Sequence, residues 1–211
     1  FVLVGIVVDA GFLGPVGHLG AASDTAAFTR FSRLLRAGIR GVRSATTATD
    51  SVRIIIHHSQ GADPERTAWF FDRLGGLDYD IIGLSYYPWW HGDIRGLRAT
   101  LAQAVTRHEK DVMVVETAYP WRRGPSWLEG SAAMAWPMTP DGQRAFLREV
   151  AAAVADAPEG RGQGVVWWDP ESIVTPGIAP WADGVLALFD GAGRILPAAD
   201  VFTDVNIGRR D

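Results

Sequence analysis

Apolar residues along the chain gather in short runs that alternate with longer segments of helical periodicity. Five runs are short and rich in β-branched residues, so each predicts a strand. These runs are residues 1–8, 52–58, 80–87, 112–116 and 164–168. Between them, apolar residues recur at helical spacing over residues 26–42, 64–76, 97–109 and 140–157. Strand alternating with helix predicts a parallel sheet with helices outside.

Polar and aromatic residues gather where the predicted strands end. They are His57, Ser85, Tyr87, Glu116, Trp168 and Asp169. Active sites of TIM barrels are built at that end of the strands, whereas the glycine-rich phosphate turns of open doubly wound sheets are absent from this sequence. The pattern predicts a partial (β/α)8 TIM barrel in which residues 1–211 form a single unit. Five units cannot close a barrel of eight, so we expect the N-terminal three to be absent from this sequence.

Composition narrows the function classes. The chain of 211 residues carries a formal net charge of −4, which provides no basic surface for nucleic acid or an anionic membrane. It has no cysteine, and its five histidines lack metal-ligand spacing, so we expect neither disulfides nor a transition-metal site. No apolar run approaches the roughly 20 residues that span a bilayer. We therefore expect no membrane partner and no required cofactor.

The carboxylate of Glu116 directly follows four apolar residues and precedes Tyr119, Pro120 and Trp121. Such a residue is either a glutamate that has reached solvent or a catalytic carboxylate in a sugar-binding cleft. Aromatic side chains stack on the apolar faces of pyranose rings, which favours the second interpretation. Four tryptophans are candidate sugar platforms, in competition with simple packing: Trp89, Trp90, Trp121 and Trp168.

Three motifs, DIIGLSYYPWWHG, ETAYPW and WWDPE, carry a family resemblance. Over nearly its whole length the chain resembles the arabinogalactan endo-β-1,4-galactanases of glycoside hydrolase family 53, as the fourth to eighth βα units of their barrel. The resemblance implies a retaining hydrolase with two catalytic glutamates. It also implies β-1,4-galactan of plant cell-wall pectin as the substrate, and secretion by a bacterium.

By this resemblance Glu116 is the nucleophile, and Val7 occupies the position of the acid/base glutamate. Ile6 stands where the family has asparagine, and Gly14 where it has tryptophan. Valine has no proton to give, so we expect impaired activity. Asp9 could replace the acid, but two residues advance a strand by about 6.6 Å. We therefore favour Asp9 as a polar residue at the cleft edge.

The remaining site positions also follow from the resemblance. His57 matches a family histidine, which favours a cleft role over a packed core position. Ser85 and Tyr87 are expected to bind substrate, and Asp169 stands where the family usually has glutamate. His91 is equally compatible with sugar contact and with solvent exposure. A structural calcium ion remains possible in the loops around residues 120–136 or 170–184, because some family members carry one.

Two alternatives to a galactanase remain open. The chain could be a non-catalytic carbohydrate-binding remnant that uses the same aromatic cleft without turnover. It could also hydrolyse another β-1,4-glycan, since related barrels share the arrangement of two glutamates.

Overall fold

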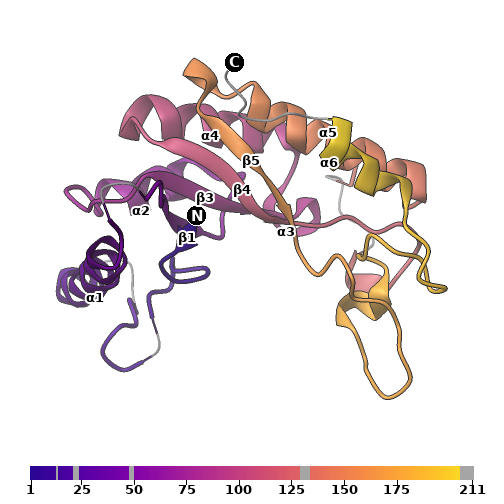
Figure 1. The fold of residues 1–211 in the computed structure, drawn as a ribbon, viewed down its shortest axis with the longest axis horizontal. Helices are drawn as coiled ribbons and strands as arrows, with labels where there is room; N and C mark the ends of the chain where they lie inside the picture. The colour runs from indigo at the N-terminus through magenta and orange to yellow at the C-terminus, as the bar shows by residue number, and fades with distance from the viewer. Residues whose placement is uncertain (13, 21–23, 48–49, 129–133, 205–211) are drawn as a thin grey trace.

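The computed structural model describes residues 1–204 except 13, 21–23, 48–49 and 129–133. Its sheet contains five parallel strands in the order of the sequence: β1 (Val2–Leu3), β2 (Ile54–His58), β3 (Ile81–Tyr86), β4 (Asp111–Thr117) and β5 (Gly162–Trp167). The strands form a curved half barrel with helices along its outer side (Figure 1). The expected partial TIM barrel is therefore confirmed. No helix within the described ranges is both long enough and apolar enough to cross a membrane.

Four main helices lie where the periodicity predicted them: α1 (Thr25–Ser44), α2 (Pro64–Asp72), α4 (Ile94–His108) and α5 (Pro140–Ala155). The side chains of Asp24, Asp63, Asp93 and Thr139 each accept a backbone N–H at a helix start. The shorter helical segments are α3 (Pro88–His91), α6 (Val201–Asp204), η1 (Ser126–Leu128), η2 (Pro158–Gly160), η3 (Trp181–Gly184) and η4 (Pro197–Asp200).

The first strand is shorter than predicted. Only Val2–Leu3 of the expected strand over residues 1–8 is extended and paired with β2. Gly5 has φ +89° and Val7 has φ +49°, so the backbone turns out of the strand. It then returns to the sheet at Val8, whose N–H donates to the carbonyl of His57. A run of β-branched residues predicts extension, but it carries no information about this local turn.

The main core lies between the sheet and the helices. Side chains alternate along the strands, so Ile54 and Ile56 of β2 and Ile82 and Leu84 of β3 face outward, where they join the buried helix residues. Each of these side chains contributes roughly 1.5–3 kcal/mol by leaving water. His58 also faces this side, and its ring packs 5.0 Å from that of Phe70.

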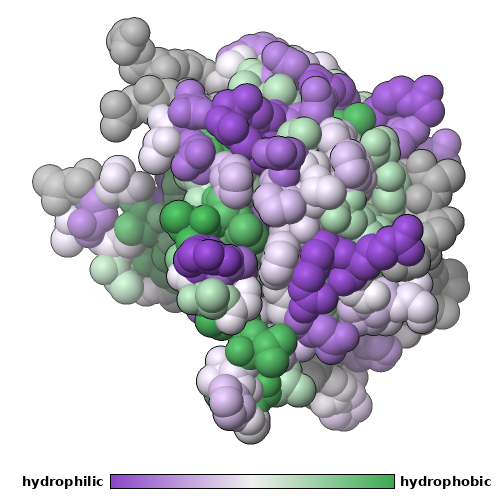
Figure 2. Space-filling view, turned by 90° about the vertical axis from the view of Figure 1, so that its right-hand side faces the viewer, coloured by the Kyte–Doolittle hydropathy of each residue, from purple (hydrophilic) through white to green (hydrophobic). Residues whose placement is uncertain are grey.

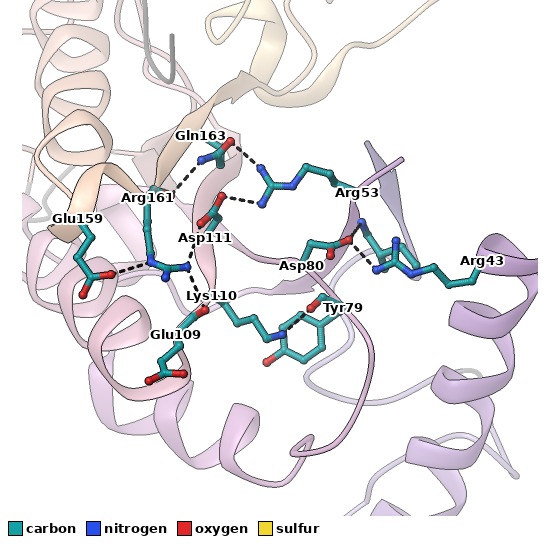
Figure 3. Close-up of polar contacts among 11 residues, drawn as sticks. Arg43, Arg53, Tyr79, Asp80, Glu109, Lys110, Asp111, Glu159, Arg161 and Gln163 are labelled. Carbon is teal, nitrogen blue, oxygen red and sulfur yellow. Dashed lines mark hydrogen bonds and ion pairs between the residues drawn. The ribbon is translucent and has the colours of Figure 1, made fainter. Parts of the chain in front are cut away.

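The concave face of the sheet is built in layers. Near the amino ends of the strands, Arg53 donates to Asp111 (2.6 Å) and to Gln163 (2.8 Å), which links the start of β2 to β4 and β5 (Figure 3). Above this ion pair lies a small buried cluster that consists of Ile55, Ile81, Met113 and Val115. Layers of this kind fill the interior of TIM barrels. Packed side chains therefore lie directly below the carboxyl ends of the strands on the concave face.

Candidate active site

An irregularity in β4 brings the polar strand ends together. The pairing of β3 with β4 shifts register between Leu84 and Ser85, so that Ser85 lies opposite Glu116. Strict alternation would turn Glu116 toward the helices together with Val114. The shift instead places Glu116 on the concave face directly after Val115, as bulges commonly do beside active sites. His57 of β2 reaches the same face because it lies two residues beyond Ile55.

Two hydroxyl groups hold the carboxylate of Glu116. The Tyr87 hydroxyl donates to Oε1 at 2.6 Å, and the Ser85 hydroxyl donates to Oε2 at 3.4 Å. Burial raises the pKa of Tyr87, and the hydrogen bond to Glu116 raises it further, so Tyr87 remains a proton donor at neutral pH. The Glu116 side chain is 13% exposed, which leaves it open to a ligand from the concave side.

His57 connects Val7 to Glu116 through a chain of hydrogen bonds. Burial lowers the pKa of His57 to about 4, so its ring is neutral at pH 7. Its Nδ1 accepts from the backbone N–H of Val7 (3.3 Å), which leaves the proton on Nε2 to donate to Ser85 Oγ (2.7 Å). The Ser85 hydroxyl is then free to donate to Glu116. A neutral ring also means that the 3.8 Å separation between His57 Nε2 and Glu116 Oε2 is no ion pair.

The two candidate positions for a proton donor differ in their chemistry. Val7 is 37% exposed and offers no ionisable side chain. Asp9 accepts hydrogen bonds from the backbone N–H (3.1 Å) and the hydroxyl (2.8 Å) of Ser59. Burial acts to raise the pKa of Asp9, but the hydrogen bonds from Ser59 and the nearby His58 together outweigh it, and the net pKa is lowered. A general acid at neutral pH needs a raised pKa, so the surroundings of Asp9 favour a structural role over proton donation.

Aromatic rings form a wall beside Glu116. The ring of Tyr87 lies 5.1 Å from that of Trp89 and 5.4 Å from that of Trp90. Trp90 stacks on Trp127 at 5.9 Å with an interplanar angle of 9°, and Trp127 stacks on Trp181 at 6.1 Å. Sequence reasoning missed Trp127 and Trp181, although both follow strand ends. Trp90 is 58% exposed and Trp127 is 44% exposed, so this wall is open to solvent.

The other expected site residues lie around this centre. Trp121 donates from Nε1 to the carbonyl of Gly184 (3.3 Å), so it ties two loops together. Trp168 follows β5 and is 37% exposed. Asp169 has φ +52°, and its charge helps to raise the pKa of Tyr87. Figure 2 shows hydrophobic patches open to solvent between strongly hydrophilic residues on one side of the molecule.

The structure favours a packing role for His91. Its Nδ1 accepts the backbone N–H of Tyr87 at 3.0 Å, and burial lowers its pKa to about 4. His91 therefore stays neutral and supports the turn that aims Tyr87 at Glu116.

The possible calcium ion stays a prediction. Within the described residues, no three His, Cys, Asp or Glu side chains gather into a group that could hold a metal. The loop around residues 120–136 includes 129–133, which lie outside the described ranges. Calcium also accepts backbone carbonyl oxygens as ligands.

The fold and the site together define a βα barrel with its candidate centre at the carboxyl ends of the strands. Residues 1–202 match the model of glycosyl hydrolase family 53, and the chain belongs to that family.

Relatives agree with this assignment. An uncharacterized protein from the bgaB 5′ region of Niallia circulans is 34% identical, over 92% of this chain and 57% of its own length. An arabinogalactan endo-beta-1,4-galactanase of Cellvibrio japonicus is 32% identical, over 74% of this chain and 43% of its own. The structure of the Ignisphaera aggregans GH53 catalytic domain aligns with a TM-score of 0.80 at 30% identity, over 95% of this chain and 57% of that domain. The chain thus spans about half the length of these relatives.

Proposed function

We propose that Glu116 is the nucleophile of a retaining glycoside hydrolase site that recognises β-1,4-galactan, and that Val7 leaves this site without its acid/base group. The observation that carries the proposal is the placement of Glu116. Its carboxylate ends a core strand, is held by Tyr87 and Ser85, and lies beside a wall of tryptophans. Family membership agrees with this chemistry, since most retaining glycosidases use a carboxylate nucleophile.

The geometry supports the first half of a double displacement. Glu116 attacks the anomeric carbon, the bond from that carbon to the glycosidic oxygen breaks, and the leaving oxygen takes the electron pair. Tyr87 and Ser85 orient the carboxylate for this attack. A sugar leaving group needs a proton at the moment of cleavage, and Val7 cannot supply it. We therefore expect slow turnover of galactan.

The substrate is proposed from the relatives and the aromatic wall. Relatives in Cellvibrio japonicus and Emericella nidulans are named arabinogalactan endo-beta-1,4-galactanases. The exposed rings of Trp90 and Trp127 suit pyranose rings, which bind aromatic side chains through their apolar faces. A polysaccharide substrate also fits action outside the cell.

A second candidate function is carbohydrate binding without hydrolysis. Val7 favours it, because the tryptophan wall needs no catalytic acid in order to bind a sugar chain. The two functions differ in whether Glu116 forms a covalent bond.

The test is covalent labelling by a 2-fluoro-galactoside with a good leaving group, followed by peptide mapping. The good leaving group departs without acid assistance, so labelling needs only the nucleophile. We expect the label on Glu116, none in Glu116→Gln, and undiminished labelling of Glu116 in Glu149→Gln. Glu149 is the matched carboxylate control, because it lies on α5 with half of its side chain exposed, away from the site. Label on another carboxylate would remove Glu116 from this role. Galactan binding with no label in the folded protein would favour the carbohydrate-binding function. Binding and hydrolysis of galactan, mannan and cellulose then define the glycan.

A further inference from the structure

A shallow apolar hollow opens beside Val7. It has a volume of about 390 Å³ and is lined mainly by Ile6, Val7, Ala10, Phe12, Gly14 and His18. His18 is the only one of these with a polar side chain. The volume falls within the range of about 300–1,000 Å³ typical of small-molecule sites. Such a lining suits a flat apolar group and offers little to the many hydroxyls of a sugar.

The hollow adjoins the candidate nucleophile through Val7. Val7 lines the hollow, and its backbone N–H donates to His57 Nδ1 at 3.3 Å. His57 in turn lies 3.8 Å from Glu116 Oε2. Val7 and His57 therefore connect the hollow to the carboxylate. Where an acid/base glutamate would meet the leaving oxygen, the chain presents the wall of an apolar site.

We propose that this hollow binds the leaving group of aryl galactosides, and that the site acts on galactosides whose aglycone departs as a stable phenolate. The proposal rests on the proposed function, because it requires Glu116 as the nucleophile. Its new content is the class of leaving group and the residues that hold it. An aromatic aglycone places its ring against Ile6, Ala10 and Phe12, and its departure requires no proton from position 7.

The chemistry balances without an acid at position 7. Glu116 bonds to the anomeric carbon, and the phenolate leaves with the electrons of the broken carbon–oxygen bond. Water then attacks the same carbon and releases the Glu116 carboxylate, while the proton of that water passes to solvent. Without a general base this second step is slow. A small anion such as azide needs no base, so it can attack the anomeric carbon directly and form the β-galactosyl azide.

The first experiment uses the protein as its gene encodes it, with dinitrophenyl β-galactoside and added azide. We expect azide to raise turnover at least tenfold and to yield β-galactosyl azide. In Val7→Glu we expect azide to lose this effect, since the new carboxylate can activate water and also repels the anion. Turnover that azide leaves unchanged, with the nucleophile labelled as above, would overturn the proposal.

The second experiment tests the hollow itself. The measured quantity is the ratio of kcat/KM for dinitrophenyl galactoside to kcat/KM for galactosyl fluoride. Neither leaving group needs an acid, and only the dinitrophenolate has an aromatic ring. The ratio therefore reports how much binding of the aglycone ring contributes. We expect Ala10→Phe, which fills the hollow, to lower this ratio at least tenfold. Ile6→Ser should lower it by a smaller factor by removing an apolar contact. Ala192→Phe, at an exposed turn outside the hollow, is the matched control.

The outcomes separate the two claims. If Glu116 is labelled and both substrates turn over, but neither hollow variant changes the ratio, the aglycone site is wrong and the proposed function stands. If Glu116 is not labelled and neither substrate is cleaved, the proposed function fails and the further inference fails with it. If Ala10→Phe does not fold, Ile6→Ser decides, because Ile6 is 63% exposed and tolerates a smaller side chain.

Discussion

The contact between the Tyr87 hydroxyl and Glu116 is the shortest polar interaction at the candidate nucleophile. A hydrogen bond to a charged group contributes about 1.5–3 kcal/mol, and about 1.4 kcal/mol changes a rate tenfold. We therefore expect Tyr87→Phe to slow labelling of Glu116 by about 10- to 100-fold. Tyr79→Phe is the matched control, since Tyr79 is buried and lies outside the site, at the amino end of β3. Equal labelling rates for the two variants would contradict the orienting role of Tyr87.

Buried neutral histidines make stability depend on pH. Burial lowers the pKa of His57, His58 and His91 to about 4, from an ordinary value of 6.5. Between these values the unfolded chain binds more protons than the folded chain, so the free energy of unfolding falls as pH falls from about 6.5 to about 4. The full shift corresponds to about 3 kcal/mol for one such histidine.

Denaturant unfolding at pH 7 and pH 4.5 measures this dependence. We expect the protein to be less stable at pH 4.5, and His57→Gln to show a smaller difference between the two pH values. A free energy of unfolding that is equal at both pH values would contradict the neutral, buried state of these rings.

Sequence reasoning found the residues at the strand ends but not their complete surroundings. Glu116, Ser85 and His57 are visible as polar residues that end apolar runs. Trp127 and Trp181 come from separate loops, and only the folded chain brings each ring to within about 6 Å of Trp90. No periodicity marks such a contact between loops. The hydrogen bonds from Ser59 to Asp9 were also not predicted, because they too join segments that are far apart in the sequence.

At the scale of elements, the register shift in β4 decides where Glu116 points. Alternation along residues 112–116 places Glu116 on the helix side with Val114, yet it lies opposite Ser85 on the concave face. An apolar run does not encode a bulge, so the side chain's direction could not be read from the sequence. The shortened β1 has a similar cause, since the turn at Gly5 and Val7 interrupts an apparently regular apolar run.

Gly83 of β3 allows the concave layer below the site to close. A Cβ at this position would lie 2.7 Å from Ile55 Cγ2 and 3.0 Å from both methyl groups of Val115. Both neighbours are buried and have little room to move. Overpacking of this kind costs about 1–3 kcal/mol, so we expect Gly83→Ala to destabilise the protein by about that amount.

The matched control for this prediction is Gly41→Ala. Gly41 lies in α1, and a Cβ there meets nothing within 4 Å. An alanine in a helix is favoured over glycine by about 0.5–1 kcal/mol, so this variant should be as stable as the parent or slightly more stable. Denaturant midpoints measure both effects. A Gly83→Ala protein as stable as the parent would contradict tight packing of the concave layer.

At the scale of the whole molecule, the alternation of strands and helices predicted the parallel sheet, and the polar strand ends with the family resemblance predicted the half barrel. The central strands β2, β3 and β4 bury one face toward the helices, and apolar side chains of the main helices pack against that face. The polar contacts at the amino ends of the strands, on the concave face, were not predictable in the same way. Arg53 and Gln163 are separated by 110 positions in sequence, and their contact depends on the curvature of the sheet (Figure 3).

The edge strands of the sheet differ from the central strands in their pairing and in the exposure of their apolar side chains. In the described part of the chain, β1 pairs only with β2, and β5 pairs only with β4. An open half barrel is expected to expose the apolar residues of its concave face. Ile55, Ile81, Met113 and Val115 are instead buried, whereas Leu3 and Val166 on the edge strands are 38% and 42% exposed. Each edge strand of the sheet therefore carries an exposed apolar side chain beside its unpaired backbone.

A polypeptide limited to residues 1–211 should for this reason self-associate through its strand edges. Unpaired backbone groups next to apolar side chains are a template for pairing between chains, and a charged side chain on the edge opposes such pairing. We expect sedimentation over a concentration series to show growing oligomers, and Val166→Lys to shift the population toward monomer. Val174→Lys is the matched control, because Val174 is 56% exposed but lies outside the strands, so the same added charge leaves both edges open. A monodisperse parent with a sharp cooperative melt, or an equal effect of both lysine variants, would contradict association through the edges.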